Sequence, residues 1–132
     1  FSAPTNALFA TVYKEYLIED VPNMAWCIGY TNNSWTLRAD MTARSVAKLL
    51  AYMDSHGYTH AYPHRGDIPM TEKPLWNLQA GYVHRAAHVL PKSGTHRPWH
   101  VRHNYVLDAI DPRFDRIEES MVFGSVPAAK SA

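Results

Sequence analysis

The residues of this chain best suited to chemistry lie in the stretch 29–36, between an apolar run and a predicted helix. The stretch contains two Asn, one Ser, two Thr and two aromatic residues, Tyr30 and Trp35. Backbone N–H groups at the start of a helix point outward at the positive end of its dipole, so they suit a phosphate, a carboxylate or the polar edge of a cofactor ring. An ordinary strand-to-helix turn with a good cap is the alternative, and the residue pattern by itself favours this alternative.

Histidine is the second candidate, because His84 and His88 are four residues apart and could share a metal ion on one helix face. The chain has one Cys and no HExxH motif, and residues 85–87 offer no carboxylate. We therefore expect solvent-facing histidines and no metal site. Cys27 lies within an apolar run and is expected to be a small buried side chain rather than a nucleophile.

Composition narrows the classes of protein further. The 132 residues are 46% hydrophobic, which fits one globular domain, and the net charge of +1 gives no basic field for nucleic acid. A single Cys excludes an internal disulfide and fits a reducing compartment. No apolar run approaches the roughly 20 residues of a transmembrane helix, and no export signal opens the chain, so we expect a cytoplasmic protein without a transmembrane segment.

The polar stretch has to be positioned by the elements on either side of it. The mixture of aromatic and β-branched residues predicts a strand over 9–18, and a short apolar run predicts a doubly buried strand over 24–28. Joined through a turn at 19–23, the two strands would form a hairpin or part of a larger sheet. A helix is expected from Leu37 to Gly57, with Ser34 or Thr36 as N-cap. Its expected apolar stripe consists of Leu37, Met41, Val46, Leu49, Leu50 and Met53.

The second half of the chain is interrupted by prolines and glycines. The patterns predict an irregular segment over 58–74, a helix over 75–90, a polar loop over 92–98, a shorter helix over 101–110, a strand over 120–123 and a frayed tail over 127–132. The fold class expected from these elements is α+β, with short strands or a hairpin and two to three helices.

Two blocks of sequence resemble the C-terminal part of class B flavoprotein monooxygenases. The first block reads VPN-x-A followed by GYTN-x-SWTL-R-AD, over residues 21–40. The second block comprises Leu75, residues 81–83, 85–86, 90–92 and 94, and then Pro98-Trp99 and Asn104-Tyr105. The matches span most of the chain between Val21 and Phe123, in the order in which the family has them.

The resemblance implies how the polar stretch is used. In the family, this strand, turn and helix close the FAD-binding domain, and the helix N-terminus points at the pyrimidine end of the flavin. A helix N-terminus would stabilise the negative charge of reduced flavin near N1 and C2=O. The resemblance therefore gives six residues as candidate FAD contacts: Asn32, Asn33, Ser34, Trp35, Thr36 and Leu37.

The same resemblance implies an oxygenase that inserts one atom of O2 into a ketone, sulfide or amine with FAD and NADPH. The glycine-rich fingerprints for the two cofactors are absent, and the chain begins with Phe1 rather than Met. We therefore expect a C-terminal fragment of a larger α/β, Rossmann-like enzyme, inactive alone and retaining neither cofactor firmly. Residues 1–57 would be the strand-turn-helix unit that closes the FAD domain, and residues 58–132 a helical and loop extension.

Two partners follow from the fragment interpretation: the missing N-terminal FAD- and NADPH-binding portion, and a second copy of the chain paired through exposed sheet edges. The alternative is a stand-alone protein-interaction module derived from such an enzyme. Such a module would use an aromatic surface around Trp76, Tyr82 and Trp99.

Overall fold

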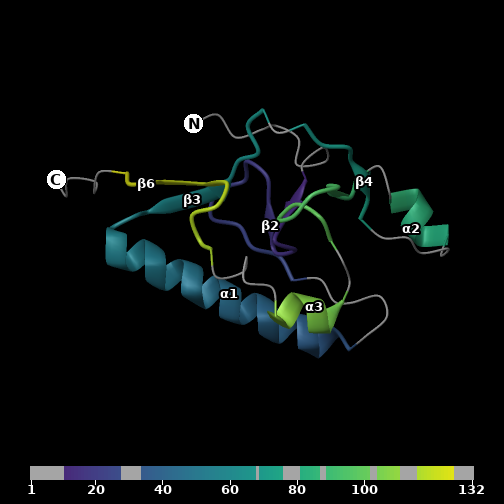
Figure 1. Ribbon diagram of the computed structural model, residues 1–132, viewed down its shortest axis with the longest axis horizontal. Coiled ribbons are helices and arrows are strands. Elements are labelled where there is room, and N and C mark those ends of the chain that lie inside the picture. The colour runs from purple at the N-terminus through teal and green to yellow at the C-terminus, as the bar shows by residue number, and fades with distance from the viewer. Residues whose placement is uncertain are drawn as a thin grey trace.

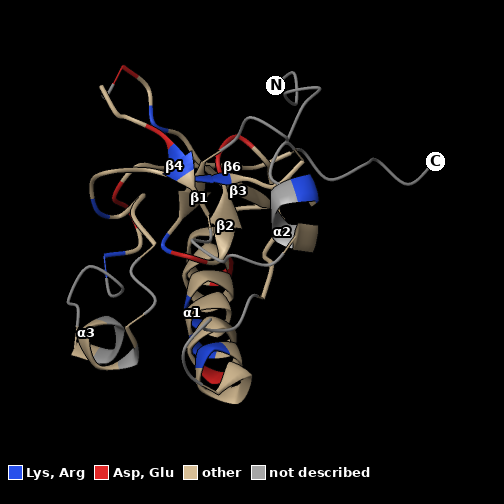
Figure 2. Ribbon diagram, turned by 90° about the vertical axis from the view of Figure 1, so that its right-hand side faces the viewer, with Lys and Arg blue, Asp and Glu red and all other residues tan. Residues whose placement is uncertain are grey.

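The computed structural model describes residues 11–27, 34–67, 69–75, 81–86, 89–101, 104–110 and 116–126. Their architecture is α+β, as expected: one long helix, two short helices and three two-stranded antiparallel sheets (Figure 1). None of the described helices is both long and apolar enough to cross a membrane. Segments bearing Lys or Arg and segments bearing Asp or Glu are interspersed over the described chain (Figure 2), in keeping with its balanced charge.

A tight hairpin forms the centre of the molecule. Strands β1 (Val12–Tyr13) and β2 (Leu17–Ile18) pair antiparallel, with Val12 opposite Ile18 and Tyr13 opposite Leu17. Lys14 and Glu15 adopt left-handed backbone angles, with φ of 46° and 66°, and so reverse the chain within three residues. The predicted hairpin was therefore wrong in its strands, because residues 11–18 of the strand expected over 9–18 fold back on themselves, while residues 9–10 lie outside the described residues.

The expected buried strand over 24–28 is also wrong for its described residues. Residues 24–27 form no strand and make one isolated bridge, between Ala25 and Leu17. The Met24 side chain is 45% exposed and Cys27 is exposed, so this apolar run lies at the surface of the described chain. Residue 28 lies outside the described residues.

The long helix agrees with the prediction. Helix α1 (Trp35–His56) begins after Ser34 and ends at Gly57, whose left-handed φ of 71° closes the helix C-terminus. Its buried residues are Arg38, Thr42, Leu49 and Met53. Of the expected stripe, Leu49 and Met53 are buried, whereas Leu37 and Leu50 are exposed, so the covered face is rotated toward Arg38.

Strand β3 (His60–Pro63) pairs antiparallel with β6 (Met121–Gly124), and Ala61 lies opposite Phe123. The strand expected near 120–123 is confirmed, but the irregular segment expected over 58–74 was wrong. It holds β3 and also β4 (Lys73–Pro74), which pairs with β5 (Lys92–Ser93) inside the expected polar loop. These pairings join residues far apart in sequence, so local periodicity could not reveal them.

The other helices are shorter than expected. Helix α2 covers Gly81–Ala86, and Leu75 is buried in a bend rather than helical, while residues 76–80 and 87–88 lie outside the described residues. Helix α3 covers Tyr105–Ile110 and contacts α1. The tail over 127–132 lies outside the described residues.

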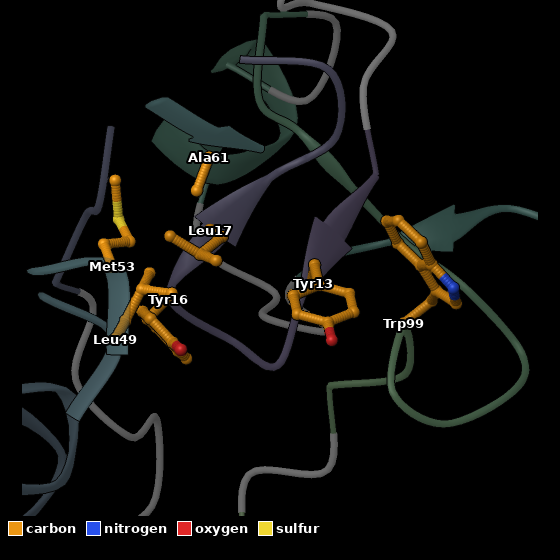
Figure 3. Packing of buried hydrophobic residues seen from close by; sticks show 7 residues of the cluster. All are labelled: Tyr13, Tyr16, Leu17, Leu49, Met53, Ala61 and Trp99. Carbon is orange, nitrogen blue, oxygen red and sulfur yellow. The ribbon is translucent and has the colours of Figure 1, made fainter. Parts of the chain in front are cut away.

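Aromatic and aliphatic side chains from the hairpin, α1, β3 and the loop before residue 100 form the core (Figure 3). Its buried members are Tyr13, Tyr16, Leu17, Leu49, Met53, Ala61 and Trp99. The rings of Tyr13 and Trp99 meet edge to face, 5.0 Å apart between centroids. This core fixes α1 to the hairpin and so fixes the position of the helix N-terminus.

Candidate functional site

The candidate site is the N-terminus of α1. Ser34 is the N-cap, with φ of −62° and ψ of 132°, but its side chain makes no capping hydrogen bond. The Ser34 hydroxyl instead lies 2.7 Å from the Thr36 hydroxyl. The first turn carries no acidic residue. The Ser34 side chain therefore leaves the N–H groups of the first turn open, and no carboxylate in this turn neutralises the helix dipole.

The side chains at this helix end face outward. Ser34 and Thr36 are exposed, Trp35 is 60% exposed and Leu37 is 36% exposed. A large flat indole held in solvent next to uncapped donors suits a planar, polar ligand edge. The structure thus brings together four of the six candidate residues, while Asn32 and Asn33 lie outside the described residues.

A buried charge network anchors the first turns of α1 to the hairpin. Arg38 Nη1 lies 2.5 Å from Glu15 Oε2, and both side chains are 3% exposed. Arg38 Nη2 also donates to the Lys14 carbonyl, at 3.3 Å. Arg97 Nη1 approaches the other carboxylate oxygen of Glu15, at 3.4 Å, and donates to the His100 carbonyl at 2.7 Å. Glu15 therefore ties the helix and the 97–100 loop to one turn.

This network was not predicted from the sequence. A signal was present: Arg38 lies four residues before Thr42 and eleven before Leu49, on the stripe that becomes buried. A charged residue on that stripe requires a buried partner, but Glu15 is far away in sequence and only the fold identifies it.

A hollow lies beside the C-terminal end of α1. It has a volume of about 530 Å³ and is lined by Tyr52 and residues 116–119. The Tyr52 hydroxyl donates to Glu118 Oε1 at 2.5 Å. The hydrogen bond to this carboxylate raises the pKa of Tyr52 to about 12, so the hydroxyl stays protonated at neutral pH. The protonated Tyr52 hydroxyl and the Glu118 carboxylate therefore form a structural contact in this hollow.

Two sequence expectations about reactive residues are corrected here. Cys27 is exposed rather than buried, because the segment 24–27 runs along the surface of α1 instead of entering a sheet. Trp99 is 1% exposed and belongs to the core, so it cannot contribute to an aromatic docking surface. Tyr82 is 65% exposed, and Trp76 lies outside the described residues.

Within the described part of the chain, no three His, Cys, Asp or Glu side chains gather as a metal site would require. The described histidines have other contacts. His64 Nδ1 lies 2.7 Å from Asp20 Oδ1, and the ring of His56 stacks on Tyr58. His88 and the side chain of His84 lie outside what the structure describes.

Comparison with known proteins identifies the relatives of this chain. It is 42% identical over 122 residues to the FAD-containing monooxygenase EthA of Mycolicibacterium smegmatis, an alignment covering 91% of this chain and 25% of that protein. It is 42% identical over 106 residues to the probable FAD-binding monooxygenase AlmA of Acinetobacter baylyi, an alignment covering 80% of this chain and 21% of that protein. EthA of Mycobacterium tuberculosis is 38% identical over 117 residues.

No family model matches the chain, and no solved structure matches it. The chain spans about a quarter of the length of the curated relatives that it matches. The homologues of this chain are FAD-containing monooxygenases, and it corresponds to one part of such a protein.

Proposed function

We propose that this chain forms the C-terminal, flavin-facing part of a class B monooxygenase that inserts one oxygen atom from O2 into a ketone, sulfide or amine. The observation that carries the proposal is the 42% identity to an FAD-containing monooxygenase across 91% of this chain. The rest of the polypeptide would bind most of FAD and the NADPH, so this chain alone would not turn over substrate. In the whole enzyme, bound FAD would supply the electron transfer and the oxygen activation.

The N-terminus of α1 fits the polar edge of a flavin. The N–H groups of residues 35–37 are donors without a bond from the Ser34 side chain, and the turn has no acidic residue that would repel a reduced, negatively charged ring. Ser34 and Thr36 would add hydroxyl donors, and the exposed Trp35 would provide an apolar wall. Asn32 and Asn33 remain part of this proposed contact set.

The charge network would act as the support of that contact. Because Arg38 lies one turn from the helix start and is held by Glu15, the first turn cannot tilt without breaking a buried ion pair. Arg38 would thus be a positioning residue rather than a group that touches the flavin. In this proposal residues 1–57 close a Rossmann-like FAD domain, and residues 58–132 extend it.

A hybrid enzyme tests the proposed site. In it, the matched region of the M. smegmatis relative is replaced by this chain, and Ser34 is changed to Asp or, as a neutral control of the same shape, to Asn. Both side chains cap helices well, but only Asp adds a negative charge. We expect Ser34→Asp to lower the reduction potential of the bound flavin relative to Ser34→Asn, because it repels the reduced ring.

The isolated chain supplies the control for stability. There, Ser34→Asp should stabilise the protein by about 0.5 kcal/mol relative to Ser34→Asn, because a carboxylate favours the positive end of the helix. If the Ser34→Asp and Ser34→Asn hybrids have the same flavin reduction potential, the placement of this helix end at the flavin is contradicted.

A further inference from the structure

Helix α1 has an apolar face that the described chain leaves uncovered. Its buried side rests on the hairpin and β3 through Leu49 and Met53. Beside that stripe runs a second one of mostly small side chains, at spacings of four, three, one and three residues: Ala39, Ala43, Val46, Ala47 and Leu50. Such spacing places all five along one side of the helix. Leu50 is 58% exposed, so the second stripe lacks a complete cover.

A groove follows this second stripe. One wall is formed by residues 25–27, and the other by the five residues of the stripe together with Thr42, around a volume of about 500 Å³. We call this hollow the small-residue groove. A second hollow of about 280 Å³ continues it, since both are lined by Ala25, Val46 and Leu50. Among the described residues, neither hollow is lined by a charged side chain.

Two residues that line the small-residue groove each have a buried polar atom without a hydrogen-bond partner among the described residues. These atoms are Thr42 Oγ1 and Trp26 Nε1. Thr42 is only 7% exposed, so its hydroxyl lacks both water and a protein acceptor in the described chain. A buried hydroxyl or indole N–H without a partner costs about 1–3 kcal/mol. Because both atoms are closed off from the groove, a docked segment could hydrogen-bond to them only after the two side chains rotate toward it.

The relatives indicate where a covering segment comes from. They are about four times as long as the matched region, so the rest of their polypeptide has to contact the matched region at some surface. The charged side of α1 is an unsuitable contact, because covering its exposed Asp40–Arg44 ion pair would remove two charges from water. Alanines spaced by four residues allow another helix to approach closely, as in ridges-into-grooves packing.

We propose that the small-residue groove is the surface on which the remainder of an FAD-containing monooxygenase docks, through an apolar helix that packs against its alanines. This inference rests on the proposed function and adds the contact surface to it. Docking there would cover the side of α1 that lies between its buried stripe and its Asp40–Arg44 side, and would bury Cys27 on the rim of the groove.

Cys27 provides the readout, because it is exposed in this chain and lines the small-residue groove. The rate of iodoacetamide labelling at Cys27, followed by peptide mass spectrometry, is compared between the isolated 132-residue chain and the hybrid enzyme. We expect labelling to be at least about tenfold slower in the hybrid, because a covered thiol reacts only when the contact opens. Equal rates in the two proteins would overturn the proposal.

Matched substitutions locate the contact. Ala43→Glu places a charge in the groove, whereas Ala51→Glu places the same charge on α1 outside it. Ala43→Glu should restore fast labelling in the hybrid, and Ala51→Glu should not. Both residues are exposed in the chain alone, so both isolated variants should keep the helical circular dichroism of the parent. Identical behaviour of the two variants in the hybrid would overturn the proposal.

The remaining outcomes separate this inference from the proposed function. A hybrid that protects Cys27 but holds no FAD supports the docking surface and refutes the proposed function. A hybrid that holds FAD but leaves Cys27 reactive refutes the docking surface and supports the proposed function. A hybrid that fails to fold while the relative folds counts against the docking surface. An isolated chain that sediments as a dimer, with Cys27 protected until Ala43→Glu is introduced, would make a second copy the occupant and overturn the proposal.

Discussion

Changing Glu15 to Gln tests the buried charge network that holds the start of α1. The substitution keeps the shape of the side chain but removes the charge that lies 2.5 Å from Arg38 Nη1. Both side chains are 3% exposed, so water cannot replace the lost carboxylate. Removing one member of a buried ion pair costs about 3–5 kcal/mol, against about 0–1 kcal/mol for an exposed pair. We expect Glu15→Gln to fall in the first range.

Urea unfolding followed by circular dichroism measures the effect. For a slope of about 1–3 kcal/mol per molar urea, a loss of this size lowers the midpoint by about 2 M. Asp40→Asn is the matched control on the same helix, because it removes an ion pair to Arg44 at 2.9 Å whose side chains are 76% and 60% exposed. The control should change stability by less than about 0.5 kcal/mol. A Glu15→Gln midpoint as close to the parent as that of Asp40→Asn would refute the reasoning.

Three further predictions concern the core and the helix end. Burial raises the pKa of Tyr16 to about 12, so between about pH 10 and pH 12 the unfolded chain loses this proton while the folded chain keeps it. The free energy of unfolding should therefore be constant below this window and fall as the pH rises through it. Tyr16→Phe should reduce the slope of this fall by roughly 1.4 kcal/mol per pH unit. Leu49→Ala should lower the free energy of unfolding in urea by about 2–5 kcal/mol, because Leu49 is buried. Leu50→Ala, at the exposed neighbouring position, should lower it by under about 1 kcal/mol, and equal losses would contradict the assigned helix face. Gly57→Ala should lower the melting temperature by about 4 °C, because the added Cβ meets no atom within 4 Å and the whole cost is the left-handed φ of 71°; an unchanged melting temperature would contradict that φ.

The sequence predicted the elements whose signals are local. Helix α1 was found because its apolar periodicity extends from Leu37 to Met53 and the helix ends at Gly57, whose left-handed φ suits a C-cap glycine. Strand β6 was found from its short β-branched and aromatic run. Strand β3 was missed, since prolines and a glycine surround it and only its pairing with β6 makes it a strand.

The candidate site, like the fold, was predictable from the sequence only in part. The position of Ser34 before a helix follows from its residue type and its neighbours. The exposure of Trp35 does not follow from the periodicity, because Trp35 lies three residues before the buried Arg38 and seven before the buried Thr42, on the same side of the helix. The support of the site was not predictable, because the turn at Lys14 and Glu15 needs left-handed angles that residues of these types seldom adopt. The buried Arg38 offsets this backbone cost by holding Glu15 in place.

The most direct test of the proposed function is whether this chain can replace the matched quarter of a known FAD-containing monooxygenase. The hybrid with the M. smegmatis relative, and that relative lacking the matched 122 residues, are purified and compared for FAD bound per polypeptide and for NADPH oxidation that depends on a ketone, sulfide or amine. We predict FAD binding and substrate-dependent oxidation in the hybrid, and neither in the deleted enzyme. A folded hybrid without FAD, or a deleted enzyme as active as the hybrid, would contradict the proposed function.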